Sequence, residues 1–64
     1  MKSFIIVEDL EGLRLAALNG MEFAYPVNNK EISSAITEVI RDGYHYNGGA
    51  LFTLEGTMYQ YMYL

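Results

Sequence analysis

Apolar runs separated by polar residues divide the chain into short segments. The first segment, Phe4–Val7, is an apolar run rich in β-branched residues. It is bounded by the acidic Glu8, Asp9 and Glu11 and then by Gly12. A short apolar run with such a boundary predicts a buried strand followed by a turn.

Residues 13–25 allow two interpretations. A helix capped by Asp9 and ended at Gly20 would place Leu10, Leu13, Ala17 and Leu18 on one face. However, Asn19 followed by Gly20 is the dipeptide that most strongly favours a two-residue hairpin turn, and the strand-like Met21–Tyr25 come directly after it. We therefore expect a hairpin here. It would pair Leu18 with Met21, Ala16 with Phe23, and Arg14 with Tyr25.

The segment from Asn28 to Asp42 has the clearest helical pattern. Asn28 is placed to cap a helix, and Glu31 follows three residues later, as in a capping box. Gly43 is placed to adopt the left-handed conformation that ends a helix, so the helix should end near Asp42. Its apolar side chains recur at helical spacing along a single stripe: Ile32, Ala35, Ile36, Val39 and Ile40. We expect this stripe to pack on a sheet.

Two strands are predicted after the helix, at 51–54 and 57–64, with Glu55 and Gly56 as a tight turn between them. The second strand has no charged side chain. Because side chains of a strand point to alternate faces, one face of it carries three tyrosines: Tyr59, Tyr61 and Tyr63. An uncharged strand is seldom left at a sheet edge. We expect this one to be central in its sheet or paired with another copy of the chain.

The predicted order of elements is β-β-β-α-β-β. It describes a small α+β domain, an antiparallel β-sheet with one amphipathic helix packed on one face. Residues 1–64 form a single domain, since a composition of 52% hydrophobic and 19% charged residues is typical of a folded chain. So small a domain normally needs reinforcement. With no cysteine and a single histidine, the reinforcement we expect is a homo-oligomer.

Charge and composition narrow the function classes. Eight acidic and four basic residues give a formal net charge of −4, which disfavours nucleic acid and anionic membranes as partners. The first apolar run is ended by Glu8 before it could form a signal peptide, and no apolar stretch approaches the ~20 residues that span a bilayer. The absence of cysteine suits a reducing compartment. We therefore expect a cytoplasmic protein without a membrane partner.

The sequence contains no pattern typical of an enzyme. There is no cysteine, no serine, threonine or lysine stands in a nucleophile motif, and the lone histidine lacks evident partners. The acids Glu8, Asp9 and Glu11 lack the dense alternation of a calcium loop, so a solvated turn explains them better. We expect neither catalysis, nor a metal, nor another cofactor.

Two segments are candidates for binding. Residues 44–49 combine aromatic rings, an amide and two glycines, so the rings could stack on a ligand while backbone N–H groups bind an anion. The candidate side chains of this loop are Tyr44, His45, Tyr46 and Asn47. The second segment is the strand of Tyr59, Tyr61 and Tyr63, because tyrosine is enriched at interfaces. Arg14 could meet the anionic part of a ligand where subunits join. Each feature also has an ordinary explanation, as a connection or as packing.

The leading hypothesis is a small non-enzymatic binding protein, an inhibitor or adaptor that blocks a host macromolecule through its tyrosine-rich surface. Small, cysteine-free, single-domain chains are common among phage and mobile-element proteins that neutralise host factors, an analogy of size and composition alone. The alternative is a homo-oligomer that binds and sequesters a small aromatic or nucleotide-like ligand at its subunit interfaces.

Overall fold

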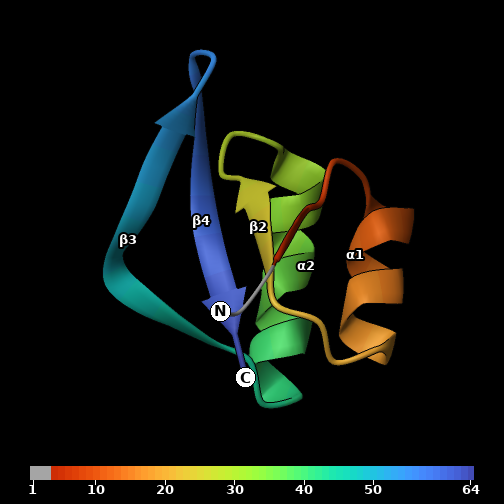
Figure 1. Cartoon of the computed structure of the whole chain (residues 1–64). Helices are drawn as coiled ribbons and strands as arrows, with labels where there is room; N and C mark the ends of the chain where they lie inside the picture. Colours follow the sequence, from red (N-terminus) through yellow and green to blue (C-terminus); the bar gives the residue numbers. More distant parts are fainter. Residues whose placement is uncertain (1–3) are drawn as a thin grey trace.

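The computed structural model describes residues 4–64, with the side chains of residues 47–50 excepted. Its elements follow the order β1 (Ile5–Ile6), α1 (Leu10–Leu18), β2 (Phe23–Pro26), α2 (Lys30–Arg41), β3 (His45–Leu54) and β4 (Thr57–Tyr63). The four strands of the described part form one sheet in the order β1-β2-β4-β3 (Figure 1). Helices pack on this sheet, and the chain is an α+β domain, as predicted.

The segment before Asn19 is a helix, α1, so the predicted hairpin is wrong. Asp9 caps the helix, because its Oδ1 accepts a hydrogen bond of 2.8 Å from the backbone N–H of Gly12. At the other end, the backbone N–H of Asn19 donates to the carbonyl of Leu15 at 3.1 Å, and Gly20 has a φ of 65°. The left-handed conformation that Asn-Gly favours serves a hairpin turn and a helix C-terminus equally well.

The helix changes the predicted architecture in three ways. Among residues 4–64 the order of elements is β-α-β-α-β-β, two helices are present instead of one, and the sheet is mixed because β1 and β2 are parallel. The predicted cross-strand pairs of Leu18, Ala16 and Arg14 do not form, since all three residues lie on α1. Ala16 is buried in the core, which shows why packing favours a helix here.

α2 confirms the predicted amphipathic helix. Its N-cap is Asn29 instead of Asn28, and the Asn29 Oδ1 accepts a hydrogen bond of 3.1 Å from the backbone N–H of Ile32. Its C-cap is Asp42, and Gly43 has a φ of 111°, as expected of the residue that ends the helix. The end of this helix was therefore predicted correctly.

The second predicted hairpin is also confirmed. Leu54 lies opposite Thr57 across the turn at residues 55–56, and β4 is a central strand that pairs with β2 on one side and β3 on the other. β3 begins at His45, so the segment predicted as a loop belongs to a strand. Its register with β4 shifts between Tyr46 and Leu51.

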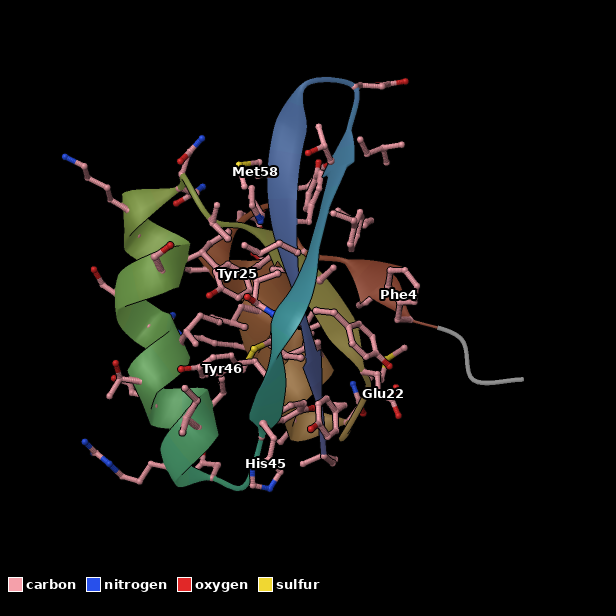
Figure 2. The ribbon with its side chains drawn as sticks, turned by 90° about the vertical axis from the view of Figure 1, so that its left-hand side faces the viewer. Phe4, Glu22, Tyr25, His45, Tyr46 and Met58 are labelled. Carbon is pink, nitrogen blue, oxygen red and sulfur yellow. The ribbon has the colours of Figure 1, made fainter. Side chains whose placement is uncertain are left out.

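Both helices lie on one face of the sheet. The crossovers β1-α1-β2 and β2-α2-β3 advance in the same direction across the sheet, and right-handed connections then place both helices on the same face. Figure 2 shows α2 on one side of the sheet and Phe4 with Glu22 on the other. The buried core lies between the layers: Val7, Leu13, Ala16, Phe23, Ile32, Ile36, Val39, Tyr44 and Met62. No helix of the described chain covers the second face of the sheet.

Candidate functional site

The uncovered face of the sheet carries a row of aromatic side chains. On the opposite face, Phe23 of β2 pairs with Met62 of β4, and both are fully buried in the core. Because side chains alternate along a strand, Tyr61 and Tyr63 on either side of Met62 point away from the helices. The six rings gathered there are Phe4, His45, Phe52, Tyr59, Tyr61 and Tyr63. We call this surface the aromatic face.

The six rings form an unbroken chain of contacts. In order, the ring centroids are separated by 6.0 Å for His45 and Tyr63, 6.2 Å for Tyr63 and Tyr61, 5.3 Å for Tyr61 and Phe4, 6.2 Å for Phe4 and Phe52, and 5.4 Å for Phe52 and Tyr59. All five separations lie within the 4.5–7 Å range of favourable aromatic pairs. Five of the rings come from β3 and β4, and the sixth, Phe4, comes from the residue before β1.

Strand register accounts for most of this row. Phe52 lies directly opposite Tyr59, and His45 opposite Tyr63, in the ladder between β3 and β4. Phe4 precedes β1 and must reach across β2 to meet Tyr61. The β2 residue opposite Tyr61 is Ala24, whose single methyl group leaves room above the strand for the ring of Phe4.

The aromatic face is accessible, and Figure 2 shows the acidic Glu22 on the same side of the sheet as Phe4. Phe4 is 45% exposed, and Phe52 and the three tyrosines are half-buried. The basic side chains that the structure describes, Arg14, Lys30 and Arg41, all belong to the helices. A contiguous apolar surface of this kind marks an interaction site more often than an ordinary solvated face.

Tyr44, a candidate from the sequence, lies in the core. Its side chain is 2% exposed, and its ring centroid lies 5.3 Å from that of Phe23. Its hydroxyl donates to the carbonyl of Met21 at 2.7 Å and lies 3.3 Å from that of Ala16. Burial raises the pKa of this hydroxyl, and the negative charge of Glu22 raises it further. Tyr44 thus connects the start of β3 to the segment between α1 and β2 through this hydrogen bond.

The other candidates of the predicted loop are divided between the two faces of the sheet. His45 joins the aromatic face through Tyr63, whereas Tyr46 lies on the helix side, where Figure 2 also shows Tyr25. Burial raises the pKa of Tyr25, and the neighbouring Tyr46 contributes to the rise. The side chain of Asn47, and the anion site proposed around it, lie outside the described residues.

Arg14 lies on α1, in the helix layer, and lines a groove between the two helices of about 410 Å³. The groove is bordered by residues of both helices: Leu13, Arg14, Ala17, Leu18, Ala35, Glu38, Val39 and Asp42. Arg14 is therefore not part of the aromatic face.

Two rings of the aromatic face, Phe4 and Phe52, were not among the site residues predicted from the sequence. The alternation that locates Tyr59 also locates Phe52 once the hairpin register is known. No local signal links Phe4 to Tyr61, because the two residues meet only across β2.

Residues 4–64 show no candidate metal site or membrane-spanning helix. Side chains of His, Asp and Glu form no group of three that could hold a metal ion in this part of the chain. Over the same residues, neither helix has the length and apolar character needed to cross a membrane. No family model matches the chain, and searches of the curated proteins and of the solved structures found no significant match.

Proposed function

We propose that this protein is a small non-enzymatic binding protein that contacts a macromolecular partner through the aromatic face and blocks or recruits it, as an inhibitor or adaptor does. The observation that supports this proposal is the continuous row of six rings on a sheet face that no helix covers. Tyrosine and phenylalanine bury a large rigid area at low entropic cost, and tyrosine is enriched among the residues that dominate binding energy.

The dimensions of the face suit the centre of a protein interface. The four strands contain 2, 4, 10 and 7 residues, 23 in all, and each residue covers roughly 3.4 Å along its strand by 4.8 Å across the sheet. The flat area of the sheet is therefore about 375 Å², roughly half of the ~800 Å² that each partner buries in a standard interface. The rings would thus form the core of the contact, and the surrounding polar residues its rim.

The proposed partner is a protein of the host cell's cytoplasm. The net charge of −4 opposes binding to phosphate backbones, and the basic side chains of the described residues lie in the helix layer, away from the rings. The apolar face therefore fits a protein surface better than a nucleic acid. The absence of cysteine agrees with a reducing compartment.

The experiment is capture from host lysate with the wild-type chain and two variants. Tyr59→Ser with Tyr61→Ser removes two rings of the aromatic face, while Tyr46→Ser makes the same chemical change on the other side of the sheet, at a side chain that is 54% exposed. We expect the double variant to bind the captured partner about 10- to 100-fold more weakly and Tyr46→Ser to bind it normally. Circular dichroism of all three proteins checks that they are folded. Equal retention of the same partner by every variant would contradict the proposal.

A second candidate function is the sequestration of a small aromatic or nucleotide-like ligand by a homo-oligomer. Two ring pairs support it, because Phe52 with Tyr59 and Tyr61 with Tyr63 are nearly parallel, at interplanar angles of 20° and 22°. Such rings present flat surfaces on which a further ring can stack. Native mass spectrometry of protein purified from its own cells would then show an oligomer with a bound compound of low mass.

A further inference from the structure

α1 exposes apolar side chains on its outer surface as well as burying them in the core. Leu13 is fully buried, but Leu15 is 54% exposed and Leu18 is 82% exposed. The only charged residues of the nine in this helix are Glu11 and Arg14. A helix that is apolar on several sides is usually covered on several sides. The outer side of α1 is therefore a candidate interface.

The groove between α1 and α2 lies directly beside Leu18. Both helices carry an alanine in its lining, Ala17 on α1 and Ala35 on α2, which explains the hollow of about 410 Å³. The buried side chains of Leu13 and Val39 also line it. An apolar side chain that enters this hollow would contact only aliphatic groups at its base.

Charges of opposite sign border the same groove. Arg14 lies on the α1 side, and Glu38 and Asp42, one helical turn apart, lie on the α2 side. Within the part of the chain that the structure describes, no ion pair joins Arg14 to either carboxylate. One small surface thus presents a protruding leucine, a hollow, a cation and two anions.

We propose that a second copy of this chain docks on the groove in a two-fold symmetric dimer. Leu18 of each copy enters the groove of the other, and Arg14 of each copy faces Glu38 and Asp42 of the other. A two-fold interface must complement itself, which requires a protrusion with a matching hollow and a cation with a matching anion on the same patch. This groove and its rim contain both pairs.

The dimer leaves both aromatic faces free. The groove belongs to the helix layer, whereas the rings lie on the other side of the sheet, as Phe4 does in Figure 2. A dimer would therefore present two aromatic faces to partners at once, and binding to a symmetric or repeated partner would gain from this bivalence. The dimer does not depend on the function proposed for the aromatic face.

Sedimentation equilibrium of the full chain tests the dimer. We expect Leu18→Glu to weaken association by about 10- to 100-fold, because it places a charge in the apolar hollow. Leu18 is 82% exposed, so this variant should remain folded. Lys30→Glu, an exposed change at the far end of α2, is the charge control and should dimerise like the wild type.

A charge exchange tests the pairing between copies. Arg14→Glu alone, and Glu38→Lys with Asp42→Lys, should each weaken self-association by at least about 10-fold, because like charges then meet across the interface. Mixed together, the two variants should form a heterodimer, since every facing pair is again opposite in sign. A merely structural role of these residues would not produce that recovery.

Two results would overturn the inference. One is a wild-type chain that stays monomeric up to about 1 mM, which would mean an association free energy weaker than about −4 kcal/mol. The other is a dimer that survives Leu18→Glu. If that dimer is lost in the variant Tyr59→Ser with Tyr61→Ser, the aromatic face is the dimer interface. If this double variant no longer captures the partner but still dimerises, the dimer proposal holds. The result would show that dimerisation and partner binding use different surfaces.

Discussion

Removal of the Tyr44 hydroxyl should destabilise the fold measurably. In Tyr44→Phe the ring keeps its place against Phe23, but the carbonyl of Met21 loses a hydrogen-bond donor at 2.7 Å. The carbonyl of Ala16 keeps its bond of 3.0 Å from the backbone N–H of Met21. One bond is therefore lost, at a cost of about 1–2 kcal/mol when its acceptor remains partly buried. For a domain of this size, this corresponds to a fall in Tm of roughly 5–15 °C.

The assay is urea unfolding followed by circular dichroism, with Tyr46→Phe as the matched control. Tyr46 is 54% exposed, so its hydroxyl should contribute less than about 0.5 kcal/mol. The slope of the unfolding free energy against urea should be the same for all three proteins, because the buried area is unchanged. If Tyr44→Phe unfolds at the same urea concentration as Tyr46→Phe, the hydroxyl does not stabilise the contact between β3 and the segment that joins α1 to β2, and our explanation of its burial is wrong.

Three further predictions concern the stability of the fold. Asp9→Ala removes the cap that accepts from the Gly12 N–H and should cost about 1 kcal/mol in urea unfolding; an unchanged midpoint would contradict the assigned start of α1. Gly43→Ala should lower the free energy of unfolding by about 1–2 kcal/mol because φ is 111° at this residue, although no atom lies within 4 Å of an added methyl group. Thermal unfolding measures this loss, and an unchanged stability would contradict the positive φ. Burial raises the pKa of Tyr25 and Tyr44, so the unfolded chain ionises at a lower pH than the folded chain does. The contribution of these two tyrosines to stability should be fully present below the ordinary tyrosine pKa of 10.0 and be lost as the pH rises above it, which urea titrations on either side of that pH would show.

Local sequence patterns predicted an element correctly where only one type of secondary structure was compatible with them. The apolar stripe of α2 and Gly43 indicate the same helix, although its cap is Asn29 and not the predicted Asn28, and the charge-free alternation of β4 indicates a central strand. The pattern before Gly20 was ambiguous, because Asn-Gly is compatible with both a hairpin turn and a helix end. Burial of Leu13 and Ala16 against the core decides in favour of the helix, and that packing cannot be seen locally.

The aromatic face could be predicted only in part, because some of its contacts follow from local alternation and others from the order of the strands. Alternation along one strand places Tyr59, Tyr61 and Tyr63 together, and the hairpin turn adds Phe52. Phe4 joins them through an order of strands that depends on two crossover connections. The side chains predicted to lie together in a loop at residues 44–49 do not form one cluster. A strand starts at His45, so successive side chains point to opposite faces of the sheet.

Tyrosine modification in host lysate tests the proposed binding surface most directly, because the chain contains its own controls. Tyr46 is exposed on the other side of the sheet and should be modified with or without a partner, whereas Tyr44 is buried and should react in neither case. With the partner bound, we predict that Tyr59, Tyr61 and Tyr63 become protected relative to the isolated chain. Protection of Tyr46 while these three tyrosines remain reactive would contradict the assignment of the aromatic face as the binding surface.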